Sequence, residues 1–60
     1  MKIWQIEIGT EKGGANVDVV DGVAETAWEA INKAMRCAKE QRGLKDPYPS
    51  RVTEIGEQVF

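Results

Sequence analysis

The chain has 60 residues, of which 42% are hydrophobic and 30% charged, with a formal net charge of -2. This length allows one domain near the lower size limit for folding without disulfides or metal ions, and the apolar content excludes a disordered chain. No apolar run approaches the roughly 20 residues of a membrane span. We therefore expect a single domain over residues 1–60 that has no contact with a membrane.

The types of residue present also restrict the chemistry. The chain contains no histidine, so it lacks the usual general base and the commonest metal ligand. Its one cysteine, Cys37, can form no internal disulfide, which is typical of a reducing compartment and predicts a cytoplasmic protein. One cysteine without histidine cannot supply the four ligands of a zinc site. We expect no catalytic residues, no cofactor and no metal.

Residues 2–8 alternate between polar and apolar side chains and predict the first β-strand. Trp4, Ile6 and Ile8 fall on one face of this strand, and Ile3 falls on the other. The next segment, Gly9-Thr10-Glu11-Lys12-Gly13-Gly14, leads into a second alternation, so it predicts a hairpin turn and not a phosphate-binding loop.

The second strand is expected over residues 15–20. Ala15, Val17 and Val19 share one of its faces, and Val20 lies on the other. The dipeptide Asp21-Gly22 is expected to end or bulge this strand before the chain enters a helix. A two-residue hairpin turn at the same dipeptide is the alternative.

The segment from Thr26 to Gly43 predicts one capped, amphipathic helix. Thr26 and Glu29 have the spacing of a capping box, and Gly43 is the expected residue just beyond the helix end. Trp28 flanks the apolar stripe and, like Trp4, is expected to fill the core; an exposed tryptophan would instead be a protein-binding hot spot. The stripe is mostly alanine and consists of Ala27, Ala30, Ile31, Ala34, Met35 and Ala38.

Two prolines predict a loop over residues 45–50, and a third strand is expected over 51–60 with a bulge near Gly56. The resulting class is α+β, with a β-β-α-β order. If the first strand, the most apolar of the three, is central, the spatial order of the strands is 2-1-3 and the connection through the helix is right-handed. The helix then covers one face of the sheet.

The second face of this sheet has no layer to cover it, although apolar faces are usually covered. We expect it to carry Ile3, Val20 and either Val52 or Phe60, and we expect a homodimer that covers this face or pairs edge strands. Tyr48, between two prolines, is a further candidate for protein contact. The sequence therefore predicts a non-enzymatic protein-interaction module that binds a protein partner or itself. Small phage and mobile-element accessory proteins are an analogy for this role.

A nucleic-acid-binding accessory protein is the alternative hypothesis. A basic patch near the helix end would contact phosphates, and its members are Lys33, Arg36, Lys39, Arg42, Lys45 and Arg51. Basic residues also favour helix C-termini on dipole grounds, and the pairs Glu29–Lys33 and Arg36–Glu40 have the spacing of exposed ion pairs. The solvated-surface interpretation is therefore favoured over nucleic-acid binding.

Three carboxylates are candidates for a second kind of site. Glu7, Asp18 and Glu54 each lie on an expected strand and could be neighbours on the open face of the sheet. Such a cluster can bind a hard cation or perform acid–base chemistry. Solvated charges on a strand face are far more common, so no catalytic or metal role is expected for them.

Overall fold

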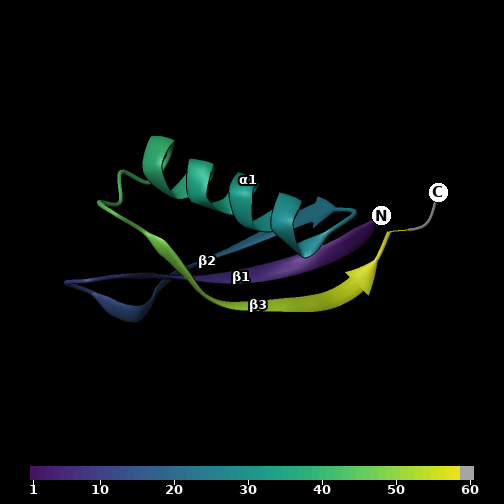
Figure 1. Cartoon of the computed structure of the whole chain (residues 1–60), viewed down its shortest axis with the longest axis horizontal. Helices are drawn as coiled ribbons and strands as arrows, with labels where there is room; N and C mark the ends of the chain where they lie inside the picture. Colours follow the sequence, from purple (N-terminus) through teal and green to yellow (C-terminus); the bar gives the residue numbers. More distant parts are fainter. Residues whose placement is uncertain (59–60) are drawn as a thin grey trace.

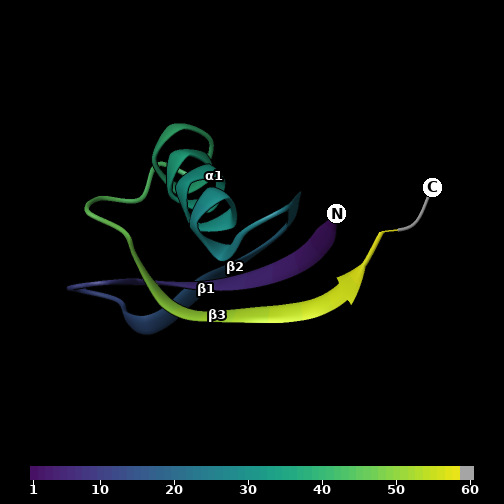
Figure 2. The ribbon, with the colours of Figure 1, turned by 45° about the vertical axis from the view of Figure 1, so that its right-hand side comes forward.

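The computed structural model describes residues 1–58 and has the element order β1, β2, α1, β3 (Figure 1). The elements are β1 (Lys2–Thr10), β2 (Gly14–Ala24), α1 (Ala27–Glu40) and β3 (Tyr48–Glu57). β1 pairs antiparallel with both other strands, which gives the order β2-β1-β3. α1 lies over one face of the sheet and leaves the other uncovered (Figures 1 and 2). The predicted α+β class and strand order are confirmed.

The core lies between α1 and the sheet. Ile6 and Ile8 of β1 are the largest fully buried side chains in the described part of the chain. The other buried hydrophobic residues are all alanines: Ala24, Ala30, Ala34 and Ala38. Small side chains on the helix allow its axis to lie close to the sheet, and a hollow of about 230 Å³ remains between α1 and β2. Partly buried residues surround this centre, among them Trp4, Ile31 and Met35.

Both ends of α1 follow from local hydrogen bonding. Thr26 Oγ1 accepts a hydrogen bond from the Glu29 N–H at 3.2 Å, as the capping-box spacing predicts. Gly43 has a φ of +64°, a conformation that glycine adopts without a Cβ penalty. The Leu44 N–H then donates to the Ala38 carbonyl at 3.0 Å, and the Leu44 side chain packs against the core.

β2 is longer than the sequence predicts. It continues through Asp21 and Gly22 to Ala24, and its register with β1 is regular from Asp18 to Ala24. The expected strand end at Asp21-Gly22 is therefore wrong, because cross-strand pairing with β1 outweighs the local turn preference of the dipeptide. Trp4 Nε1 donates to the Ala24 carbonyl at 3.0 Å and so fixes this end of the strand.

β3 begins at Tyr48, within the segment predicted to be a loop. The strand lies at the edge of the sheet and is bulged between Pro49 and Arg51, and a proline is tolerated at an edge or a bulge. Ser50, the extra residue of this bulge, has its hydroxyl 3.1 Å from the Glu7 carbonyl. A second irregularity separates Glu54 from Gly56, as predicted.

Candidate interaction surfaces

The strand register decides which side chains share the open face, because residues directly opposite each other point to the same side. Ile6 stands opposite both Val20 and Val52, and all three belong to the helix side, where the two valines pack against the core. The prediction that Val20 lies on the open face is therefore wrong, and so is the alternative that Val52 lies there, because pairing with Ile6 turns both valines toward the helix. Ile3 lies on the open face as predicted, opposite Val23.

The open face of β2 is more apolar than its helix side. Val17 and Val19 point away from α1 and remain 40% and 39% exposed. On the helix side, Gly22 and Ala24 present little bulk beneath the alanine stripe. Val17 and Val19 therefore face solvent, whereas Val20 packs against the core on the helix side.

Tyr48 lies against the sheet instead of projecting from a loop. It pairs with Gly9 at the start of β3, and its side chain is 42% exposed. A Cβ placed on Gly9 would lie 2.6 Å from the Tyr48 Cζ atom, so the ring occupies space that only a glycine leaves free. Phe60, the fourth predicted contact residue, lies outside the described residues.

Trp28 is a surface residue. Its side chain is 70% exposed, the largest value among the exposed large hydrophobic residues of the described chain. The expectation that it fills the core is wrong, because Trp28 lies on a different side of the helix from the buried Ala30 and Ala34. Asn32 and Lys39, which follow at four and eleven residues, share its side of the helix and are also exposed.

The three carboxylates considered above do not form a cluster. Each is paired with a different basic residue: Lys2 Nζ lies 3.4 Å from Glu54, Arg51 Nε lies 3.6 Å from Glu7, and Arg42 contacts Asp18. The strand register separates them, since Asp18 stands opposite Ile8 on the helix side while Glu7 lies on the open face. Within residues 1–58 no three acidic or sulfur ligands gather in a way that could hold a metal ion.

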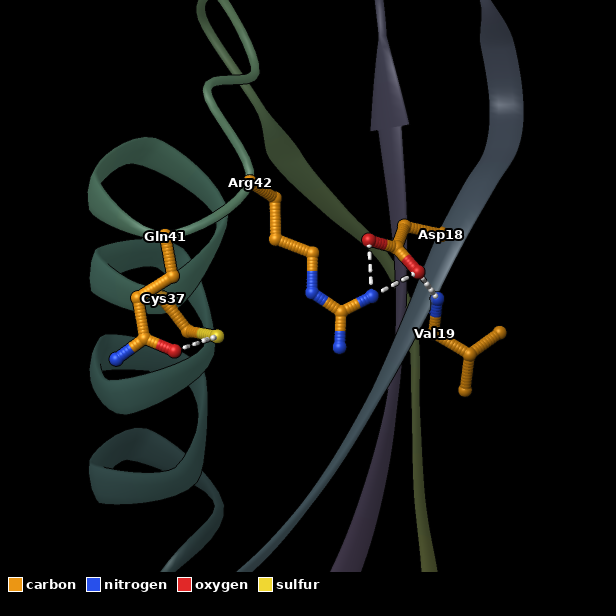
Figure 3. A network of polar contacts seen from close by, with 5 residues as sticks. All are labelled: Asp18, Val19, Cys37, Gln41 and Arg42. Carbon is orange, nitrogen blue, oxygen red and sulfur yellow. Dashed lines mark hydrogen bonds and ion pairs between the residues drawn. The ribbon is translucent and has the colours of Figure 1, made fainter.

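Arg42 joins the helix end to β2 (Figure 3). Its Nη1 atom lies 2.5 Å from both carboxylate oxygens of Asp18, which also accepts a hydrogen bond from the Val19 N–H at 2.8 Å. The backbone hydrogen bond and then the guanidinium lower the pKa of Asp18 from its ordinary value of 3.8. On the same turn, Cys37 Sγ donates to Gln41 Oε1 at 3.6 Å.

The lowered pKa of Asp18 predicts a specific dependence of stability on pH. The unfolded chain binds a proton at this group at a higher pH than the folded chain does, so the contribution is fully present above 3.8 and is lost as the pH falls further. We expect Asp18→Asn to reduce the slope of unfolding free energy against pH below this value. Denaturant unfolding of both proteins across the acid range measures it, and parallel profiles would contradict the assignment.

The six basic residues of the predicted patch differ in the contacts that they make. Lys33 Nζ donates to the Val23 carbonyl at 3.2 Å, and Arg42 and Arg51 are paired with carboxylates. The expected pairs within the helix, Glu29–Lys33 and Arg36–Glu40, are not among the ion pairs formed in residues 1–58. The exposed remainder of the patch consists of Arg36, Lys39 and Lys45.

Two hollows lie beside the helix. One, of about 260 Å³, lies between the hairpin turn at Glu11-Lys12 and the loop Gly43–Asp46. The other, of about 230 Å³, lies between α1 and β2, and its walls include Val20, Gly22 and Ala34. Both volumes are below the ~300 Å³ at which sites for small molecules usually begin.

Two surface features emerge that sequence reasoning placed in the core or on the wrong face: Trp28 and the valines of β2. For Trp28 a signal was present, since Asn32 and Lys39 on the same side of the helix are polar. For the valines no such signal existed, because the helix covers the less apolar face of β2.

Comparison with family models, curated proteins and solved structures finds no match to this chain. In residues 1–58 no helix is long and apolar enough to cross a membrane.

Proposed function

We propose that this chain is a non-enzymatic protein-interaction module, active as a homodimer in a reducing compartment such as the cytoplasm, that binds a partner protein through Trp28. The observation that carries the proposal is the indole of Trp28, 70% exposed on a regular helix. Tryptophan is enriched among the residues that dominate binding energy at protein interfaces. By analogy with small accessory proteins of phages and mobile elements, the module acts by occupying its partner and not by catalysis.

The position of Trp28 suits an anchor residue. It lies in the first turn of α1, two residues after the Thr26 cap, so its backbone is held in place before binding. Rigid aromatic side chains lose little conformational entropy when they are immobilised in a partner's pocket. The polar side chains of Asn32 and Lys39 on the same side of the helix supply the hydrophilic surroundings that interface anchors usually have.

Replacement of Trp28 tests the proposal. We expect Trp28→Ala to weaken capture of the partner about 30-fold, the equivalent of a hot spot of ~2 kcal/mol, while changing the unfolding free energy by no more than ~0.5 kcal/mol. Asn32→Ala, on the same exposed side of the helix, is the matched control and should capture the partner normally. The measurement is quantitative mass spectrometry of proteins retained by the tagged chain from a host lysate. Equal retention by wild type and Trp28→Ala would overturn the role of Trp28.

The same capture experiment distinguishes binding to a partner protein from the alternative, binding to a nucleic acid. Before elution, half of each sample is treated with nuclease and the other half is washed at increasing salt. Protein contacts through Trp28 should survive nuclease, whereas binding through Arg36, Lys39 and Lys45 would be lost with nuclease and would weaken steeply with salt. If the captured material disappears with nuclease and is unchanged by Trp28→Ala, the nucleic-acid role replaces the one proposed here.

A further inference from the structure

We infer that two copies of this chain associate through α1, with the two helices packed antiparallel and Trp28 of each helix against Lys39 of the other. This association rests on the function proposed above. It makes a second copy of the chain the protein that contacts Trp28, so the Trp28 site and the homodimer become one interface. The observation behind it is a stripe of residues along the side of α1 that carries Trp28.

The stripe has the spacing of a seam between packed helices. Its members follow one another at intervals of four, three and four residues, as in a heptad repeat, and they are Trp28, Asn32, Met35 and Lys39. At 3.6 residues per turn, the stripe lies roughly a third of the way round the helix from the buried alanines. Met35 is partly buried beside the core, and the other three members are exposed. No described element covers this side of the helix (Figures 1 and 2).

Two further charges border the stripe on one side. Glu29 and Arg36 are exposed and lie seven residues apart, so they occupy the same position in consecutive heptads. Neither takes part in the ion pairs formed within residues 1–58, and Lys39 takes part in none of them either. One carboxylate and two cations along the seam can therefore pair with a second molecule.

An antiparallel pair of helices matches these charges. When Trp28 stands opposite Lys39 of the second copy, the ammonium group meets the indole in a cation–π arrangement. In the same register Glu29 lies beside Arg36 of the second copy, which gives an ion pair of the kind that flanks the seam of a coiled coil. Two-fold symmetry forms each of these contacts twice, so the helix is complementary to itself.

The other arrangements of the same seam bring like charges together. A shift of the two-fold axis by half a heptad toward the helix start places the two Glu29 side chains beside each other. The same shift toward the helix end does so for the two Arg36 side chains, and a parallel pair of helices places Lys39 opposite Lys39. Like charges at such positions act against an arrangement, so the charges select one register and one orientation.

The edges of the sheet are less suited to a second copy. On β2, the Val19 N–H donates to Asp18 Oδ1 at 2.8 Å and the Val23 carbonyl accepts from Lys33 Nζ at 3.2 Å. On β3, Pro49 has no N–H to donate, and proline is one of the means by which natural sheets prevent pairing of their edges. Side chains and a proline thus obstruct the edges, whereas the outer side of α1 is open.

Two variants with opposite charge changes test the pairing of Glu29 with Arg36. In Glu29→Lys the added lysine lies beside Arg36 of the second copy, and in Arg36→Glu the added glutamate lies beside its Glu29. We expect each variant alone to weaken the dimer at least about tenfold in sedimentation equilibrium. An equimolar mixture of the two restores opposite charges at both contacts and should form a heterodimer within about threefold of wild-type affinity.

Glu40→Lys is the matched control, because it makes the same charge change on a different side of the helix. It should leave the affinity of the dimer within about threefold of wild type. Trp28→Ala removes the aromatic contact and should weaken the dimer at least about tenfold. Far-UV circular dichroism checks the fold of each variant. If a single charge variant is unfolded, the mixture decides: a folded heterodimer supports the pairing, and the absence of one overturns it.

The outcomes separate this interface from the proposed function. A wild-type chain of 6.7 kDa that remains monomeric up to about 100 µM would overturn both the homodimer and the association through α1. A wild-type dimer that Trp28→Ala and both charge variants leave intact would overturn the helix interface alone. If Trp28→Ala loses a different protein from the lysate capture but does not weaken the dimer, the partner role of Trp28 stands and the second copy is excluded from its site.

Discussion

Ile8→Ala is expected to lower the free energy of unfolding by about 2–5 kcal/mol. Ile8 has no exposed surface, and with Ile6 it supplies the largest fully buried side chains of the described core. The buried residues of the facing helix are the alanines of its stripe, which are too short to fill the vacated volume. A domain of 60 residues is typically stable by only about 3–9 kcal/mol, so this single change removes a large share of the total.

Urea unfolding followed by far-UV circular dichroism measures the effect of Ile8→Ala. Ile55→Ala is the control, because Ile55 is also a strand isoleucine but is 49% exposed and should change stability by no more than ~0.5 kcal/mol. If the two variants lost equal stability, the core would not lie between β1 and α1 as described.

Gly9→Ala is expected to destabilise the protein by about 1–3 kcal/mol, the usual cost of forcing extra atoms into filled space. A Cβ at Gly9 would lie 2.6 Å from Tyr48 Cζ and 2.8 Å from the Gly14 carbonyl oxygen. The tyrosine ring can swing aside, but the carbonyl belongs to the backbone of the neighbouring strand. Both the β1–β2 turn and the start of β3 must therefore adjust. Thermal unfolding should show a fall of several degrees.

Two comparisons make the Gly9 result specific. Gly22→Ala adds the same methyl group to a strand glycine that has no atom within 4 Å of the new Cβ and no positive φ, so it should be neutral or stabilise by up to ~1 kcal/mol. Tyr48→Ala removes the ring but not the Gly14 carbonyl. Gly9→Ala should therefore still destabilise the Tyr48→Ala background. Full rescue in that background would show that the ring alone makes the contact.

The elements of the fold were predictable where local signals agreed. The helix carries its own start at Thr26 and an uninterrupted stripe, and the structure confirms both. The helix ends earlier than predicted, at Glu40 with Gln41 as its cap, and Gly43 follows with a positive φ. The ends of β2 and β3 were missed because partners distant in sequence determine them. Gly22 remains in a strand because Trp4 stands opposite it, and Pro49 is accommodated because β3 is an edge strand.

The candidate surfaces were harder to predict, for a geometric reason. The apolar pattern of β2 favours burial of Val17 and Val19, yet the hairpin register turns Val20 toward the helix. Register depends on the irregularity between Ile8 and Thr10 beside the hairpin turn, and a shift of one residue exchanges the two faces of a strand. Trp28 was placed in the core because it is apolar and flanks the alanine stripe, although Asn32 and Lys39 on the same side of the helix are polar.

The contrasting surroundings of the two tryptophans make the chain its own optical reporter. Trp4 is half-buried, with its indole N–H bonded to the Ala24 carbonyl and Lys2 Nζ 6.0 Å from its ring centroid, whereas Trp28 faces water. Indole emission shifts to longer wavelength as the ring meets water, so the two contributions differ in colour. Trp28→Phe leaves one fluorophore that follows the opening of the β2–α1 junction. Trp4→Phe leaves only Trp28, whose emission responds to a molecule that binds over the helix.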